Sequence, residues 1–367
     1  MSDPNFLSEQ VLTAGLTPFL QQAVPASDFL YERPGTSSTV RRLFSYATSP
    51  TPLAATIEEQ RRDANLISER VSYQTGPLTR ASAVVVRSAK TRNQLPGLIL
   101  FHCHSGVYRW GSEKLFAAEA DSPALWQFRQ EKYAGRSLAH DFAQAGFLVL
   151  VPDTFYFGRR ALGQESIDAA ANDIDSLRRS SELLVSKMLA LAGHTWPALN
   201  AWEAQRALDY LYTRVEVDAH HIGCLGLSLG GFQSLLLAAR DYRVTAAVSA
   251  GWLTTTADLL QGKIRKHSWM VLPWGVFPTP DFPAIAAAAS PAALLVLLCA
   301  QDHLFTEAGM RTAATQLEEG YRTAGAADRC RTEFFDVLHS FTQPMQRRAL
   351  AWLKYHLLDR RHSVSQV

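Results

Sequence analysis

One serine in the chain has the surroundings that a catalytic nucleophile needs. Ser228 is the central residue of the segment GLSLG (226–230), which follows an apolar run and precedes a stretch rich in Ala and Leu. A sharp strand-to-helix turn brings the positions two before and two after the serine close to neighbouring backbone, so both must be small, and here both are glycine. The hydroxyl is then exposed at a helix N-terminus, whose free N–H groups favour developing negative charge. An ordinary glycine turn is the alternative, but the flanking pattern favours a nucleophile elbow.

A serine nucleophile needs a histidine to take its proton and a carboxylate to orient that histidine. Where the serine lies on an elbow, the acid and then the histidine follow it in the chain. Asp302 comes directly after the apolar run LLVLLC, and His339 follows the next strand-like run, TEFFDVL. Each separation leaves room for a helix and a strand, so both side chains should project from the same sheet edge as Ser228. The order predicts a Ser228–Asp302–His339 triad.

Other acids and histidines compete for these roles. Asp153 follows the strand-like run FLVLVP at the expected edge, but it precedes Ser228, so a carboxylate that braces neighbouring loops is the favoured interpretation. Only His339 ends its own strand with an acid already behind it in the chain. The remaining competitors are Asp258, Asp281, Asp336, His303, His356 and His362.

The segment HCHSG (102–106) follows an early apolar run and is the candidate for an oxyanion loop. An oxyanion hole of this kind combines the N–H after the nucleophile, here that of Leu229, with an N–H from such a loop. We expect the second donor to be His104, with Ser105 as the alternative. The His-x-His spacing also suggests a metal site, but no further ligands with recognisable spacing accompany it, so we predict no metal.

Three aromatic residues are candidates for substrate binding. Tyr156 lies beyond a strand end in TFYFGRR, Trp252 follows the run VTAAVSAG, and Trp269 lies in a long irregular segment. For both tryptophans, packing is an equal alternative. The two arginines of TFYFGRR could anchor a substrate carboxylate, but surface ion pairs are favoured. For His267 a solvated loop is favoured over a place in the site.

The elements that must position these residues form an α/β pattern. From residue 82 onwards, continuous apolar runs bounded by turn residues alternate with helical stretches. This alternation indicates a mostly parallel twisted sheet with helices on both faces. Residues 1–80 are predicted to form an N-terminal extension, helical around TIEEQRRDANLISERV, packed on a main domain of residues 81–367. Residues 253–290 are predicted to be an irregular insertion near the site.

Composition excludes several classes of protein. With 36 basic and 34 acidic residues the formal net charge is +2, so neither nucleic acid nor an anionic membrane is an expected partner. The start MSDPNFLSEQ lacks the pattern of a secretory signal, and no run of 18 apolar residues suggests a membrane span. Four cysteines are too few for a disulfide scaffold. We therefore expect a soluble cytoplasmic protein with reduced thiols.

These motifs together resemble the α/β-hydrolase superfamily, and within it the serine esterases grouped with dienelactone hydrolase and acetyl xylan esterase. The resemblance runs from about Leu98 to Leu357 through FHCHSG, GSEK, YAGRSLAHDFAQAGFLVLVPDTFYFGRR, GLSLGG and LHSF. It implies the α/β-hydrolase fold and puts Ser228, Asp302 and His339 on the triad positions. The chain departs from the family in carrying Ser105 where glycine is common and Ser112 where relatives carry a basic residue. Dienelactone hydrolase itself has a cysteine nucleophile, where this chain has serine.

The resulting hypothesis is a serine hydrolase that cleaves a small carboxylic ester through an acyl-enzyme, with no cofactor. Ser228 attacks, His339 acts as base, Asp302 orients the imidazole, and the Leu229 and His104 N–H groups bind the oxyanion. The same apparatus could act on a lactone, thioester or amide, or transfer the acyl group to an alcohol. A non-catalytic hydrolase-fold protein that binds a ligand is the alternative from another class.

Overall fold

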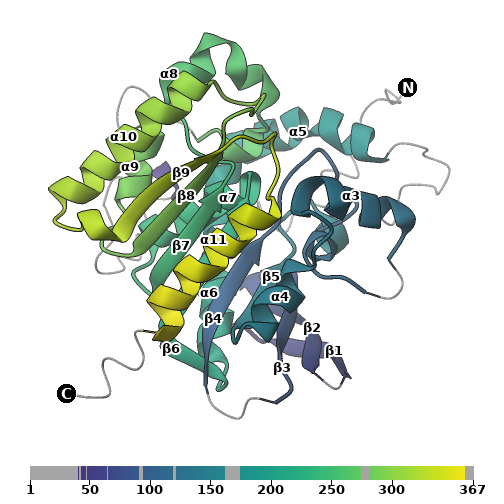
Figure 1. Ribbon diagram of the computed structural model, residues 1–367. Helices are drawn as coiled ribbons and strands as arrows, with labels where there is room; N and C mark the ends of the chain where they lie inside the picture. The colour runs from purple at the N-terminus through teal and green to yellow at the C-terminus, as the bar shows by residue number, and fades with distance from the viewer. Residues whose placement is uncertain are drawn as a thin grey trace, which may run out of the picture.

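A nine-stranded sheet forms the centre of the molecule (Figure 1), with the strand order β1-β2-β3-β5-β4-β6-β7-β8-β9. The computed structural model describes residue 40 and residues 43–46, 48–63, 65–90, 94–118, 121–161, 174–273 and 281–359. Strands β1 to β3 pair antiparallel with one another, and β3 pairs antiparallel with β5. From β5 through β4 and β6 to β9 every pairing is parallel.

The bounds of these elements follow the chain. The strands are β1 (Thr56–Arg62), β2 (Leu66–Gly76), β3 (Thr79–Ser88), β4 (Leu95–Phe101), β5 (Leu148–Pro152), β6 (Val217–Leu227), β7 (Val244–Ala250), β8 (Ala293–Cys299) and β9 (Cys330–Phe335). The helices are α3 (Pro123–Tyr133), α4 (Leu138–Gln144), α5 (Ile174–Leu191), α6 (Trp196–Thr213), α7 (Leu229–Arg240), α8 (Thr256–Asp258), α9 (Phe282–Ala287), α10 (Glu307–Thr323) and α11 (Gln343–Lys354).

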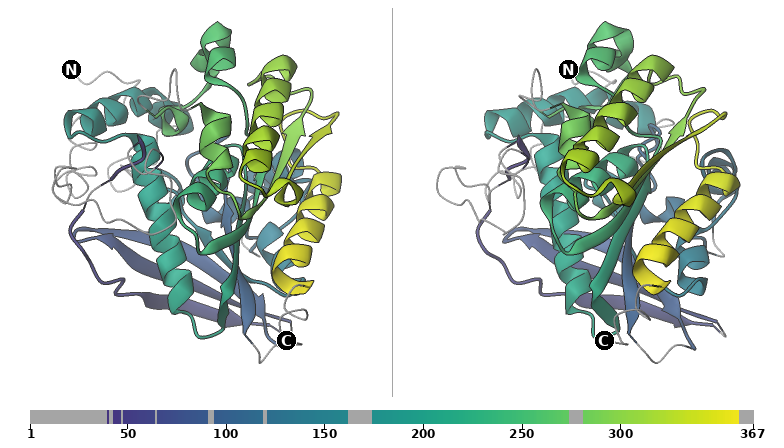
Figure 2. Two further views of the ribbon diagram at one scale, coloured as in Figure 1. Left: turned by 90° about the vertical axis from the view of Figure 1, so that its left-hand side faces the viewer. Right: turned by 60° about the vertical axis from the view of Figure 1, so that its left-hand side comes forward.

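Helices cover both faces of the parallel part of the sheet. Residues of α6, α7, α9 and α10 belong to one hydrophobic core, and residues of α3, α4 and α11 belong to a second core on the other face. Figure 2 shows α6 and α11 on opposite sides of the central strands. Strands β4, β5 and β8 are buried along their whole length, which explains why they read as continuous apolar runs. The predicted fold class is confirmed.

The predicted helix around TIEEQRRDANLISERV is wrong, because this stretch forms strands β1 and β2. Its glutamates, glutamine and arginines suit a helix, but β2 buries Val71 and Tyr73 against the core while it pairs with β3 over ten residues of β3. Tertiary pairing of this extent overrides the weak local preference. The proposed boundary between residues 80 and 81 falls inside β3, so residues 56–80 are part of the sheet.

The carboxyl ends of the parallel strands meet at one edge. In the register, Phe101 lies beside Gly226, Leu227 beside Ala250, and Cys299 beside Phe335. The loops that follow β4, β6, β7, β8 and β9 therefore all begin at this edge of the sheet. The described residues of the segment 253–290 form short helical turns, of which α8 and α9 are part, and residues 274–280 fall outside the described residues.

Two further observations bear on the sequence predictions. Within the described residues, no helix is both long enough and apolar enough to cross a membrane. All four cysteines are unpaired; three are buried and Cys330 is half-buried. Burial raises the pKa of the Cys299 thiol to about 11 and that of Cys330 to about 12.

Candidate active site

Ser228 occupies a sharp turn between β6 and α7. Its backbone has φ 59° and ψ −117°, a positive-φ conformation that residues other than glycine rarely adopt. A Cβ atom on Gly226 would lie 2.2 Å from the carbonyl carbon of Gly230, and a Cβ on Gly230 would lie 2.1 Å from the carbonyl oxygen of Phe101. Both positions therefore require glycine, for the reason inferred from the sequence.

Backbone contacts hold this turn against the neighbouring strands. The Ser228 N–H donates to the carbonyl of Ala250 at the end of β7 (2.8 Å). Helix α7 begins at Leu229, whose N–H belongs to the first turn and has no partner within the helix. The close approach of Gly230 to the end of β4 brings this N–H beside the loop that follows β4.

Asp302 and His339 meet beyond the ends of β8 and β9. Asp302 Oδ2 lies 2.5 Å from His339 Nδ1, and Asp302 Oδ1 accepts the N–H of Leu304 (2.9 Å). The Asp302 side chain is fully buried. The carboxylate accepts a hydrogen bond from Nδ1–H, which leaves Nε2 of the imidazole unprotonated and able to accept a proton. Gly251, at φ 59°, leaves the space that the ring occupies, since a Cβ there would lie 3.2 Å from its Cε1 atom.

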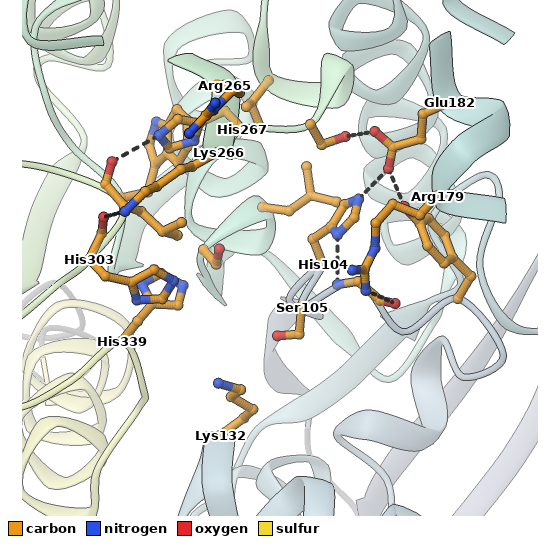
Figure 3. Close-up of a pocket in the computed structure, with 18 residues that line it drawn as sticks. His104, Ser105, Lys132, Arg179, Glu182, Arg265, Lys266, His267, His303 and His339 are labelled. Atoms are coloured by element: carbon orange, nitrogen blue, oxygen red, sulfur yellow. Dashed lines mark hydrogen bonds and ion pairs between the residues drawn. The ribbon is translucent and has the colours of Figure 1, made fainter. Parts of the chain in front are cut away.

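Ser228, Leu229 and His339 line one cavity of about 430 Å³. Figure 3 shows His339 and His303 on one side of this cavity, and His104, Glu182 and Arg179 on the other. In the described part of the chain no hydrogen bond joins Ser228 to His339. Catalytic hydrogen bonds of this kind commonly tighten only when substrate binds.

The four acidic residues that competed with Asp302 accept hydrogen bonds from groups other than His339. Asp153 is buried, and burial raises the pKa of its carboxyl to about 6. It braces the turn at residues 111–112, as the sequence suggested. Each competitor has a hydrogen-bond donor of its own: the Ser112 N–H for Asp153 (2.6 Å), Thr306 Oγ1 for Asp258 (2.6 Å), Thr256 Oγ1 for Asp281 (2.6 Å) and Gln301 Nε2 for Asp336 (2.8 Å).

Two of the three competing histidines lie in the described part of the chain. His303 is exposed, with its ring centroid 6.3 Å from that of His339. His356 packs against Trp352 in the C-terminal helical region, with the two rings tilted and their centroids 4.4 Å apart. His362 lies outside the described residues.

Both histidines of the loop 102–106 use both ring nitrogens within the protein. The His102 ring accepts the Thr154 N–H at Nε2 and contacts the Cys103 carbonyl through Nδ1. His104 accepts the Gly106 N–H at Nδ1 (2.9 Å), so its Nε2 carries the proton that it donates to Glu182 (2.7 Å). This pattern leaves no ring lone pair free for a metal. Across the described residues, no group of three or more His, Cys, Asp or Glu side chains could hold a metal ion.

The backbone of this loop faces the start of α7. Among the described residues, no acceptor binds the backbone N–H of His104. His104 and Ser105 both line the cavity, and Ser105 has φ 53°. The geometry thus brings both candidate oxyanion donors of the loop to the cavity that Leu229 also lines.

Glu182 on α5 is a site residue that the sequence did not reveal. Its carboxylate accepts hydrogen bonds from His104 Nε2, from the Tyr108 hydroxyl and from Ser268 Oγ (2.8 Å). Burial opposes ionisation, but the interactions with His104, Tyr108 and Ser268 outweigh it and hold the pKa of Glu182 below its usual value. One carboxylate therefore joins α5, the loop after β4 and the insertion. It lies in an ordinary helical pattern, with no motif to mark it.

The structure places the three aromatic candidates in different surroundings. Trp252 lines the cavity and packs edge-on against Phe305, with ring centroids 5.3 Å apart. Trp269 is 40% exposed and is not among the residues that line the cavity, so the structure does not bring it to the cavity wall. Tyr156 is not among the lining residues either; its side chain is fully buried and its hydroxyl donates to the Arg178 carbonyl (3.1 Å).

The remaining polar candidates either form ion pairs within the protein or line the cavity. Arg159 forms an exposed ion pair with Glu58 (3.0 Å), and Arg160 forms a buried ion pair with Glu203. His267, expected in solvent, instead lines the cavity, where burial lowers its pKa to about 4. Lys266 donates to the His303 carbonyl (2.9 Å). It is one of four basic side chains among the residues that line the cavity. These are Lys132, Arg179, Arg265 and Lys266 (Figure 3).

Comparisons with known proteins agree with this fold. Residues 132–357 match the model of the dienelactone hydrolase family. The chain is 23% identical over 274 residues to the Bacillus subtilis (strain 168) protein YtaP, named as a hydrolase; the match covers 74% of this chain and 82% of that protein. A Bacteroides fragilis NCTC 9343 structure, named as an acetyl xylan esterase, superposes with a TM-score of 0.64 at 15% identity, covering 98% of this chain and 94% of that one. A glucuronoyl esterase from Solibacter usitatus gives 0.57 at 15% identity, covering 92% and 99%.

Proposed function

The chain belongs to the dienelactone hydrolase family of carboxylic-ester hydrolases, and we propose that it cleaves a small-molecule ester through a serine acyl-enzyme. One observation carries the proposal. The Asp302–His339 contact of 2.5 Å lies at the edge of a cavity that also contains Ser228 on its strained turn. These three side chains supply a nucleophile, a base and an orienting carboxylate in the chain order that such elbows require.

In the first half-reaction, Ser228 Oγ attacks the ester carbonyl while His339 Nε2 takes its proton. Asp302 holds the proton on Nδ1 and stabilises the imidazolium that forms. Negative charge develops on the carbonyl oxygen, and the N–H groups of Leu229 and His104 stabilise it. The tetrahedral intermediate then breaks its C–O bond, and the leaving alkoxide takes the proton from His339.

In the second half-reaction, His339 takes a proton from water as the water oxygen attacks the acyl carbon. The bond to Ser228 Oγ breaks, the proton returns to the serine, and the carboxylic acid leaves. Trp252 and the neighbouring apolar side chains form the wall on which an acyl or alcohol group can pack. Lactone, thioester and amide hydrolysis, and transfer to an alcohol, use the same steps with another leaving group or acceptor.

A fluorophosphonate probe tests the proposal directly, because it reacts readily with an activated serine hydroxyl and not with an ordinary one. We expect stoichiometric labelling at Ser228, identified by peptide mass spectrometry, and none in Ser228→Ala. A panel of 4-nitrophenyl and alkyl esters then ranks acyl and alcohol preference. A folded wild-type protein that neither labels nor hydrolyses any ester would support the non-catalytic ligand-binding alternative.

We also propose a cytoplasmic location. All four thiols are unpaired, as in proteins of reducing compartments. Expression of the full chain with a compartment marker, followed by fractionation, tests it.

A further inference from the structure

Lys114 is buried beside the loop that carries the candidate oxyanion donors. It ends the short 3₁₀ helix η1 (Ser112–Lys114) and has no exposed surface. Its Nζ atom donates to the carbonyl of Cys103 (2.8 Å) and to the carbonyl of His104 (3.2 Å). Within the described residues it has no carboxylate at ion-pair distance. An ammonium group is costly to bury without such a partner, so its two carbonyl contacts call for an explanation.

The explanation lies in the peptide units that it binds. In a trans peptide the C=O and the following N–H point in opposite directions. With the Cys103 carbonyl turned toward Lys114, the His104 N–H points away from it. The His104 carbonyl also faces Lys114, so the Ser105 N–H of the next peptide points away from the lysine too. The lysine thereby orients both candidate donors of the loop.

We propose that Lys114 is the positioning residue of the oxyanion hole, holding the peptides 103–104 and 104–105 so that their N–H groups face the substrate oxygen. This inference rests on the proposed function, because it assigns a role within that reaction. Lys114 acts through the backbone and does not line the described cavity.

The surroundings of the ammonium suit this role. The Nζ atom lies 4.4 Å from the ring centroid of Phe157 and 5.6 Å from that of Phe128, so cation–π attraction partly replaces lost hydration. The loop itself is strained at Ser105, with φ 53°, and needs contacts that fix it. A positive charge in a site of low dielectric also polarises the two peptides, which makes their N–H groups stronger donors.

Protonation of Lys114 provides a readout. Burial lowers its pKa to about 8. Above this pH the amine is neutral, so the peptides lose the adjacent charge and turnover should fall. The charged or titratable groups around it are His102 and Cys103 from the loop after β4, Glu113 from η1, Asp153 from the end of β5, Asp175 from α5, and Arg129 from α3, which binds the Glu113 carbonyl.

The test compares Lys114→Met and Lys114→Gln with the wild type, using 4-nitrophenyl acetate as substrate. Met keeps the length without a donor, and Gln keeps a donor without the charge. Loss of one oxyanion donor lowers kcat by about 10²- to 10³-fold, and a displaced donor should lower it by about 10- to 100-fold with less change in KM. The wild type should lose kcat as the pH rises through about 8, and both variants should lack this decline. The matched control is Lys187→Met, an exposed lysine on α5.

Each outcome separates the possibilities. Variants that lose stability but keep the wild-type kcat and pH profile would show a merely structural lysine and overturn the inference. If Lys114→Met does not fold, Lys114→Gln and the alkaline decline of the wild type remain decisive, and a wild-type kcat that is flat to pH 10 overturns the proposal. If the wild type hydrolyses no ester and takes up no fluorophosphonate, the proposed function itself fails, which is a distinguishable result.

Discussion

The two walls of the cavity are built by different means. On one wall, Ser228, Asp302 and His339 follow strand ends whose positions come from sheet register and glycine contacts. On the other wall, the loop 102–106 is held by side chains from separate elements. These are Tyr133 of α3, whose hydroxyl accepts the Cys103 N–H (2.9 Å), together with Glu182 and Lys114. Changes on the first wall should therefore separate activity from stability, whereas changes on the second should couple them.

The largest effect is expected at the nucleophile. Ser228→Ala should lower kcat by about 10⁴- to 10⁶-fold, because no other group can form the acyl-enzyme. Its Tm should stay close to the wild-type value, since the turn depends on glycines and on a backbone hydrogen bond. Steady-state kinetics and thermal unfolding measure both. A purified variant with near-normal turnover would remove Ser228 from the mechanism.

The next effect is expected at Asp302. Asp302→Asn keeps the shape but removes the charge, and the imidazole can then adopt the wrong tautomer, so kcat should fall by up to about 10⁴-fold. The matched control is Asp153→Asn, a buried carboxylate that braces residues 111–112 and should keep its turnover. If Asp153→Asn loses turnover while Asp302→Asn keeps it, the carboxylate that orients His339 is Asp153, at the end of β5.

Substitutions on the wall that contains the loop 102–106 should have smaller effects on kcat, and they should lower stability as well. In Glu182→Gln, an amide replaces a carboxylate that accepts three hydrogen bonds, so at least one donor loses its acceptor. The free energy of unfolding should fall by about 1–3 kcal/mol, and kcat should fall together with it as the loop shifts. Urea unfolding and kinetics test this, with the exposed Glu307→Gln as control. Lost activity at unchanged stability would contradict the proposed difference between the walls.

The smallest effect on turnover is expected from Asp153, which acts on pH-dependent stability. Burial raises the folded pKa to about 6, whereas an unfolded aspartate has a pKa of about 3.9. Between these values the folded chain holds a proton that the unfolded chain has released, so this contribution to stability falls as the pH rises and is lost above pH 6. The difference in unfolding free energy between wild type and Asp153→Asn should change by about 2 kcal/mol from pH 4 to pH 7. A constant difference across this range would refute the prediction.

The same contrast explains what the sequence could and could not predict. Strand ends are marked by apolar runs, so the meeting of Asp302 with His339 and the glycine contacts around Ser228 could be expected. Glu182 could not, because its three partners come from distant segments and its helix carries no motif. Lys114 was visible only as part of GSEK, a motif without an evident role. The β1–β2 hairpin was hidden because its charged residues suit a helix until the pairing with β3 decides the outcome.

The backbone of Ser228 has a consequence for how such a chain evolves. A side chain held at φ 59° carries about 1–3 kcal/mol of strain, which glycine would avoid. Stability and turnover therefore pull this single position in opposite directions. A population selected only for heat resistance should accumulate glycine at residue 228 and lose its catalysis, whereas selection for turnover keeps the serine in place against that pressure.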